Sequence, residues 1–319
     1  MRRRMNIQTG FCTVVAGILF TACTQGEFSA NPDHGKGTNE ALNITGVRLN
    51  RGVETRADEL DRTLDGATDR IGIFLKADPA NGYAAIDNHL YTYAAPFWQT
   101  EEQLLLNKIP ARLSAYYPYS EGSASNPVLL RSQLFGTAQD LCYAPFGASS
   151  GTSSVALRLA HAYSRIKFGF ARDPSLTTEG IVNRLTVTGT GIRSVAQLDL
   201  FTAGDAAITG LPEVVPGVDL DLSAWTESTR TIPMTVDGLF IPGALSGKLE
   251  LRISVDGREK TGYVAATALC GVAGTLLAGK VYEVKLTVKE EKELVISSVK
   301  VTSGWDDHNS GTPVEGETN

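Results

Sequence analysis

The chain has 319 residues, a formal net charge of -6 and a pI near 5.4, and 42% of its residues are hydrophobic. An acidic balance without a basic patch argues against nucleic acid as a partner. At roughly 100 to 200 residues per domain, the length favours two domains. The 32 glycines and 13 prolines lie between short runs of Val, Ile, Leu, Thr and Tyr. That pattern predicts an all-β chain in which many strands are joined by turns.

The N-terminus has the features of an export signal. Three arginines at positions 2–4 precede an apolar stretch, 11–20, that is too short to span a bilayer as a helix. The sequence LFTAC at 19–23 resembles a bacterial lipobox, which predicts that Cys23 is acylated and becomes the new N-terminus. The alternative is an ordinary signal peptide with a coincidental cysteine. Residues 24–40 are polar and rich in Gly and Pro, which suits a flexible tether between a membrane and the fold.

The first predicted strand lies in ALNITGVRLNR, residues 41–51. Leu42 and Ile44 share one face, and Val47 and Leu49 resume the alternation after Gly46. A glycine between two alternating pairs is a suitable place for a β-bulge. We therefore expect a strand with one buried face here.

A charged and weakly patterned segment, 52–68, follows this strand. With Arg51, Arg56 and Arg62 in or beside it, the segment offers cleavage sites to a trypsin-like protease. The plainer interpretation is an ordinary surface loop.

From residue 70 the first half reads as a series of short strands. RIGIFLK at 70–76 is the clearest, and runs within 89–119, 128–135 and 140–146 follow with alternating apolar faces. Aromatic residues gather among these strands, and they offer either a sugar-binding platform or, as we favour, core packing. These residues are Trp98, Tyr116, Tyr117 and Tyr119.

The alternating pattern of Leu157–Phe170 predicts one long strand that divides the chain into two halves. A Gly/Ser-rich stretch precedes it, and a turn at 171–174 follows it. The second half repeats the style of short strands at even spacing, which is typical of a β-sandwich. Asp256-Gly257 within 253–264 predicts a tight hairpin, because both residues tolerate a positive φ.

Four cysteines and two short motifs remain to be assigned. Cys12 leaves with the signal, and Cys142 and Cys270 are either buried thiols, which we favour, or a disulfide. GASSG at 147–151 fits the G-x-S-x-G pattern, but a strand rather than a helix is predicted after it, so the sequence predicts no enzyme. Trp305-Asp306-Asp307-His308 could hold a metal, although a solvated acidic tail is the favoured interpretation. No cofactor is predicted.

An ordered set of segments resembles the fimbrillin family in its Mfa-like branch. The set comprises the lipobox, Thr55-Arg56-Ala57, Asp69 to Phe74, Leu113 to Tyr119, Asp140 to Ala144, His161 to Phe168 and Val301 to Trp305. Cys142 stands where the family usually has an aliphatic residue. The resemblance implies two tandem transthyretin-like β-sandwich domains with Greek-key topology, lipoprotein export, cleavage after an arginine of the leader, and assembly into type V pili by strand exchange.

On this resemblance we expect a structural and adhesive subunit of fimbriae at the outer membrane and cell surface. Its partners would be other fimbrial subunits, the membrane through the lipid, and a host or bacterial surface ligand. The processing sites would be Arg56 or Arg51, and the C-terminal segment 293–301 would be either a donor strand or the end of the second domain. The alternative is a surface lipoprotein that binds glycan or protein and does not polymerise. The expected parts are a signal peptide at 1–22, a tether and leader strand at 23–56, domains at 57–152 and 153–305, and a polar tail at 306–319.

Overall fold

The computed structural model describes residues 38–50, 62–121, 125–210, 217–224, 229, 234–302 and 305. These residues are mostly β-strand, as the sequence predicts. Their helical content is one short α-helix, α1 (Ala266–Cys270), and three 3-10 turns, η1 (Pro79–Asn81), η2 (Ser150–Thr152) and η3 (Gly204–Ala207). No helix in this part of the chain is long and apolar enough to cross a membrane.

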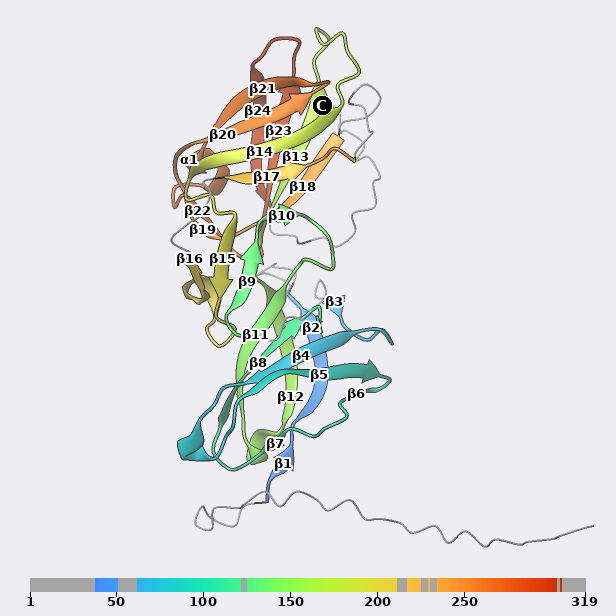
Figure 1. Cartoon of the computed structure of the whole chain (residues 1–319), viewed down its shortest axis with the longest axis vertical. Helices are drawn as coiled ribbons and strands as arrows, with labels where there is room; N and C mark the ends of the chain where they lie inside the picture. The colour runs from blue at the N-terminus through green and yellow to red at the C-terminus, as the bar shows by residue number, and fades with distance from the viewer. Residues whose placement is uncertain are drawn as a thin grey trace, which may run out of the picture. The chain divides into compact units, whose positions relative to one another are not determined.

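The strands fall into several sheets (Figure 1). Those up to residue 161 are β1 (Glu40–Ala41), β2 (Asn43–Leu49), β3 (Arg62–Thr63), β4 (Arg70–Leu75), β5 (Ile86–Ala94), β6 (Phe97–Gln99), β7 (Leu105–Leu106), β8 (Ala111–Tyr117), β9 (Val128–Arg131), β10 (Gln133–Leu134), β11 (Cys142–Ala148) and β12 (Ser154–His161). Those after it are β13 (Ser164–Arg172), β14 (Val182–Thr190), β15 (Val195–Leu198), β16 (Ile208–Gly210), β17 (Val218–Asp221), β18 (Met234–Phe240), β19 (Gly243–Ala244), β20 (Ser246–Val255), β21 (Arg258–Ala265), β22 (Thr275–Leu276), β23 (Val281–Val288) and β24 (Leu294–Thr302).

An eight-stranded sheet holds the first part of the chain, in the order β3-β2-β12-β11-β8-β4-β5-β6. Alternate side chains of these strands point into one core cluster, whose members run from Leu42 to Leu159. β4 departs from strict alternation, because Ile71 to Leu75 are all buried. Its two faces serve different cores: Ile73 belongs to this cluster, whereas Phe74 belongs to another.

Two sheets share the core of the second part of the chain. The five-stranded sheet has the order β10-β18-β13-β23-β24, and the four-stranded sheet has the order β17-β14-β20-β21. Side chains such as Phe168 and Val284 from the first sheet, and Leu185 and Ile253 from the second, pack into one cluster. This burial is the main favourable term in the folding of this part.

A third cluster draws on both parts of the chain, from Phe74 to Trp305. Strands also pair across the predicted boundary at residues 152 and 153: β9 pairs with β15, β10 with β18, and β2 with β12. The boundaries of the two domains therefore stay a prediction.

The segment 157–170 is not the single long strand that the sequence predicts. β12 ends at His161 and β13 begins at Ser164, and the two belong to different sheets. Ala162 and Tyr163, which lie between them, are buried in the third cluster. Both stretches alternate in the same manner, so the pattern alone could not show that the chain changes sheet between them.

The hairpin predicted at Asp256-Gly257 is confirmed. β20 and β21 pair from Val255 with Arg258 to Lys248 with Ala265. Asp256 has a φ of 48° and Gly257 a φ of 76°. Positive φ at both central residues is the geometry of a two-residue turn that matches the twist of its strands.

A buried ion pair joins neighbouring strands of the five-stranded sheet. Arg165 of β13 donates from Nε to the Asp237 Oδ1 of β18 at 2.8 Å, and from Nη2 to Oδ2 at 2.5 Å. The side chains are 1% and 4% exposed. Phe135 lies over the Arg165 guanidinium at 3.7 Å from the ring centroid, which adds a cation–π contact. Loss of either charge would leave the other buried without its counter-charge.

Substitution of Asp237 tests this pair. We expect Asp237→Ala to lower the free energy of unfolding by about 3 to 5 kcal/mol, because it removes the bidentate counter-charge of a buried guanidinium. The matched control is Asp219→Ala, which breaks the exposed Arg184–Asp219 pair, with side chains 62% and 46% exposed, and should cost less than about 1 kcal/mol. Urea denaturation monitored by circular dichroism measures both. Equal losses would contradict the account.

Candidate functional site

The predicted leader strand is a full member of the eight-stranded sheet. β2 pairs in parallel with β12, from Asn43 with Ser154 to Leu49 with Leu159, and antiparallel with the two-residue strand β3 (Figure 1). The register of the parallel pair shifts beside Gly46, so the bulge expected there is present.

The apolar face of β2, together with Leu42 just before the strand, packs into the first core, and we call the place that it occupies its groove. Leu42, Ile44, Val47 and Leu49 are between 0% and 5% exposed. Burial of four such side chains is worth about 6 to 12 kcal/mol as an upper estimate. Because the whole free energy of unfolding of a domain is about 5 to 15 kcal/mol, burial of this face is a large part of what stabilises the first core.

Hydrogen bonds hold both ends of the strand. The Leu42 amide donates to the Leu104 carbonyl, and the Asn50 amide donates to the Leu159 carbonyl, each at 2.8 Å. The buried Tyr91 hydroxyl donates to the Leu42 carbonyl at 3.3 Å, and burial raises the pKa of Tyr91 to about 12, so it remains a donor at neutral pH.

β12 relies on β2 for nearly all of its main-chain pairing. Its residues 154–159 pair with β2, whereas its pairing with β11 is limited to His161 with Cys142 and Ala160 with Tyr143. Without β2, most of β12 would present unpaired amide and carbonyl groups at a sheet edge. Such an edge can accept a strand from another chain.

The predicted processing and lipid sites cannot be placed in this structure. Cys23, Arg51 and Arg56 lie outside the described residues, so each stays a prediction. Arg62 is described: it is half-buried and pairs with Leu49 at the start of β3, and it is therefore not an exposed loop residue.

The predicted C-terminal donor segment is β24 in this structure. It pairs antiparallel with β23, from Val288 with Leu294 to Val281 with Thr302, and forms an edge of the five-stranded sheet. The segment therefore completes its own sheet here, and a donor role in an assembled state stays a prediction.

A buried polar cluster lies where β11 and β12 meet. The His161 Nδ1 is 3.0 Å from each carboxylate oxygen of Asp140 and 3.2 Å from the Cys142 Sγ. Trp305 covers this group: its indole Nε1 donates to the Asp140 Oδ2 at 2.9 Å, and its ring stacks on the imidazole with centroids 4.0 Å apart. All four residues are buried, with Trp305 only 1% exposed.

Sequence reasoning missed this cluster. Cys142 and His161 are direct register partners in β11 and β12, and Asp140 precedes Cys142 by two residues. The sequence does contain D-x-C and, later, a histidine. Without the pairing register of β11 and β12, however, it does not show that these side chains meet. Asp306, Asp307 and His308, for which a solvated acidic tail is favoured over a metal site, lie outside the described residues.

The aromatic group favours core packing over a sugar platform. Trp98 and Tyr116 are 6% and 3% exposed, and the Tyr116 hydroxyl donates to the Asn88 Oδ1 at 2.5 Å. Tyr117 and Tyr119 are half-buried. Stacking on a ligand needs an exposed ring face, which Trp98 and Tyr116 do not offer.

The remaining cysteine and serine motifs have structural places. Cys142 and Cys270, both among the described residues, form no disulfide, as the favoured prediction has it, but only Cys142 is buried and Cys270 is half-buried. Burial raises the pKa of the Cys270 thiol to about 11. G-x-S-x-G spans the end of β11 and the turn η2, and β12 follows at Ser154, so the strand–helix setting of a nucleophile elbow is not present at this motif.

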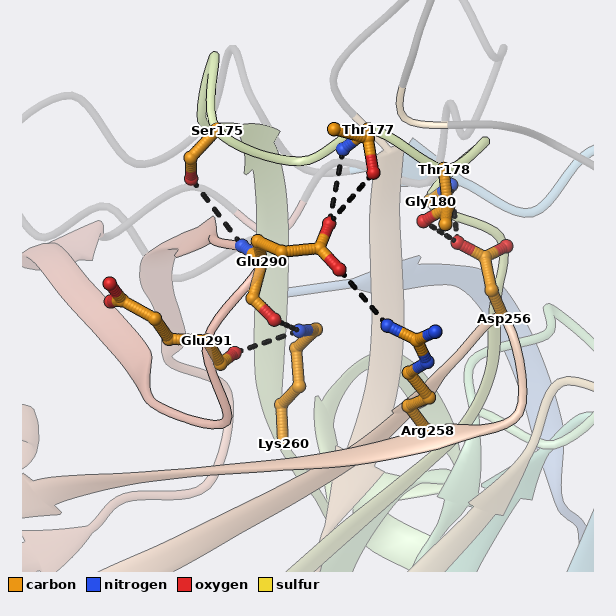
Figure 2. Close-up of polar contacts among 9 residues, drawn as sticks. All are labelled: Ser175, Thr177, Thr178, Gly180, Asp256, Arg258, Lys260, Glu290 and Glu291. Carbon is orange, nitrogen blue, oxygen red and sulfur yellow. Dashed lines mark hydrogen bonds and ion pairs between the residues drawn. The ribbon is translucent and has the colours of Figure 1, made fainter.

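A second polar network ties three loops at one end of the second core (Figure 2). The Asp256 carboxylate of the β20–β21 turn accepts hydrogen bonds from the Thr178 hydroxyl at 2.5 Å and from the Gly180 and Ile181 amides at 2.8 and 2.9 Å. Burial raises the pKa of Asp256, but these hydrogen bonds and the nearby Arg172 outweigh it, so the pKa lies below its usual value.

The same network holds the loop between β23 and β24. The Glu290 carboxylate accepts from the Thr177 amide at 3.1 Å and from Arg258 at 3.0 Å. The buried Lys260 donates from Nζ to the Glu290 and Glu291 carbonyls at 3.0 and 2.8 Å (Figure 2). Burial lowers the pKa of Lys260. These contacts fix the three loops to one another.

Comparisons with known proteins give one family match and several solved structures of similar fold. A family model described as fimbrillin-like matches residues 55–305. Among solved structures, the chain resembles a candidate cell adhesion protein from Bacteroides ovatus, with 16% identity, a TM-score of 0.57, and coverage of 84% of this chain and 99% of that one. It also resembles a candidate cell adhesion protein from Bacteroides uniformis, with 19% identity, a TM-score of 0.55, and coverage of 82% and 99%. No curated protein matches the chain.

The lowered pKa of Asp256 predicts a dependence of stability on pH. Its contribution is complete above the unfolded pKa of about 4 and is lost as the pH falls through the lower folded pKa. Asp256→Asn, which tolerates the positive φ, should therefore be less stable than the natural protein at neutral pH, and the difference should shrink as the pH falls below about 4. Urea denaturation across that range measures it. Glu259→Gln, at an exposed site on β21, is the control; an equal and pH-independent effect in both variants would refute the assignment.

Proposed function

The chain belongs to the fimbrillin-like family, and on that premise we propose that it is a structural and adhesive subunit of cell-surface fimbriae, exported as a lipoprotein through Cys23. The observation that carries the proposal is β2: a strand with a buried face that pairs along its length with β12 and is followed directly by a segment with Arg51 and Arg56. The role is mechanical and adhesive rather than catalytic.

The proposed architecture is two tandem transthyretin-like β-sandwich domains, at 57–152 and 153–305. Two large and separate core clusters support it, one within residues 42–159 and one within 166–294. Strand pairing across residue 152 means that each domain would keep some strands of the other part of the chain.

Cleavage after Arg51 or Arg56 would act by removing a tether. While the chain is intact, the short connection between Leu49 and Arg62 keeps β2 at a high effective concentration beside its groove. A cut leaves all contacts of β2 in place, but β2 is then held only by non-covalent contacts and can dissociate. A second strand can then compete for the same groove.

The vacated groove would offer two kinds of interaction at once. The β12 edge would supply main-chain hydrogen bonds, and the pockets of Leu42, Ile44, Val47 and Leu49 would supply specificity for an alternating apolar strand. This is strand addition, and it polymerises a chain when each subunit donates a strand to the next. β24 and the tail that follows it are the proposed donor, because β24 already lies at a sheet edge.

Controlled proteolysis tests this function. Treatment with an Arg-specific protease should give a folded form beginning at Gly52 or Ala57, and that form should build SDS-resistant ladders with time. The Arg51→Ala/Arg56→Ala double variant should stay monomeric and folded under the same treatment, because surface substitutions in a weakly patterned segment of this kind usually change stability by less than about 0.5 kcal/mol. N-terminal sequencing and gel electrophoresis give the readout.

Two results would decide against assembly by leader removal. If the cut form stays folded and monomeric at high concentration, the chain is a non-polymerising surface lipoprotein that binds glycan or protein. If the uncut form polymerises equally well, removal of β2 is not the switch.

The lipid anchor has its own test. Cys23→Ala should abolish incorporation of labelled palmitate and release the precursor from the membrane fraction, because the acyl chains provide the proposed anchoring. Cys12→Ala is the matched control, since it lies within the predicted signal and should be labelled normally. Acylated protein from the Cys23→Ala gene would rule out this site.

A further inference from the structure

The cluster of Asp140, Cys142 and His161 gathers three metal-ligating atoms in a buried site. One ligand atom from each residue lies within 4.8 Å of the others. The strand register fixes this arrangement, because Cys142 and His161 stand opposite each other in β11 and β12. Residues paired in this way have Cβ atoms about 4.5 to 5.5 Å apart, so their side chains meet without any rearrangement of the backbone.

Hydrogen bonds within the cluster do not satisfy both ring nitrogens of His161. The His161 Nδ1 faces a carboxylate and a sulfur at the same time, and a neutral imidazole carries one proton at most on that nitrogen. The other ring nitrogen, Nε2, is buried and has no partner among the residues that the structure describes. The crowding at Nδ1, where two acceptors compete for one proton, is what a metal ion bound at that nitrogen would relieve.

We propose that Asp140, Cys142 and His161 bind a zinc ion. Zinc takes thiolate, imidazole and carboxylate ligands, which is the set that this cluster offers, and three protein ligands with a water in the fourth position is an established coordination. Tetrahedral zinc places nitrogen and oxygen ligands about 3.3 Å apart and nitrogen and sulfur ligands about 3.5 Å apart. The observed nitrogen–oxygen and nitrogen–sulfur separations of 3.0 and 3.2 Å lie about 0.3 Å below these values, and all three ligand atoms lie within 4.8 Å of one another.

Trp305 is the positioning residue of the site. Its indole N–H holds the Asp140 Oδ2, and its ring stacks on His161. A donor that fixes a ligating carboxylate in this way usually raises metal affinity about 10- to 100-fold. The zinc site would thus connect the β11–β12 pair to the C-terminal end of the described chain.

Binding has a defined proton balance. The Cys142 thiol gives up its proton to solvent and binds as thiolate, and the His161 proton moves from Nδ1 to Nε2 so that Nδ1 can donate its lone pair to the ion. The imidazole stays neutral, and one proton is released for each ion bound. Binding is therefore favoured as the pH rises.

Titration of the full chain with zinc chloride, after removal of metal with a chelator, tests the proposal. Calorimetry should show one ion per chain with release of one proton, and calcium chloride should show no binding at this site, because calcium requires six to eight oxygen ligands. Cobalt chloride should give a thiolate-to-cobalt absorption band. Cys142→Ser and His161→Asn should each abolish the band and the tight zinc binding, whereas Trp305→Phe, which keeps a ring but lacks the N–H, should weaken binding about 10- to 100-fold.

Matched controls separate this site from other ligands in the chain. Cys270→Ser and His89→Asn remove a thiol and an imidazole elsewhere in the chain and should leave zinc binding unchanged. The triple variant Asp306→Asn/Asp307→Asn/His308→Asn removes the acidic tail ligands and should also leave it unchanged. Binding that survives in Cys142→Ser, or that disappears in the triple variant alone, would overturn the proposal. Since a cluster variant could fail to fold, the natural chain gives a decisive result by itself: folded protein without the cobalt–thiolate band contradicts the site.

Discussion

The pairing of β2 with β12 is the interaction on which the first half of the structure depends. Residues 154–159 of β12 have β2 as their ladder partner, and the apolar face of β2 fills a groove of the first core. β3, on the far side of β2, is only two residues long. The sheet is thus completed by a strand near the start of the described chain, and residues 51–61 link that strand to the rest of the chain. Because β2 buries a large apolar area and is joined to the rest of the sheet by one short connection, a cut in that connection is enough to make β2 replaceable.

The two halves of the chain are also bound to each other by a continuous set of buried contacts. The chain leaves the eight-stranded sheet at His161 and enters the five-stranded sheet at Ser164. Around this crossing lie the Arg165–Asp237 ion pair and the His161 cluster. Trp305 stacks on His161, and the centroid of its ring is 5.8 Å from the Arg165 guanidinium carbon. Trp305, at the end of the described chain, is therefore packed at the point where the chain passes from the eight-stranded to the five-stranded sheet.

Local patterns predicted the elements better than they predicted partners. Alternation identified β2, with its bulge at Gly46, and Asp256-Gly257 identified the β20–β21 hairpin, since both signals are contained within a few residues. The parallel pairing of β2 with β12 joins residues more than 100 positions apart, and no local pattern carries it. The break between β12 and β13 at Ala162 and Tyr163 was not predicted for the same reason. An alternating apolar pattern is the same whether the paired strands lie in one sheet or in two. The Asp140, Cys142 and His161 cluster needed a strand register before its chemistry could be recognised.

The central claim is that β2 is a replaceable occupant of its groove, and rebinding of the strand tests it most directly. A synthetic peptide of residues 40–50 should bind the cleaved, leader-free protein with one peptide per chain and should suppress ladder formation. It should not bind the uncut protein, whose groove is filled. A control peptide with Leu42, Ile44, Val47 and Leu49 replaced by Ser should bind neither form. Folded, leader-free protein that ignores the natural peptide would contradict the account.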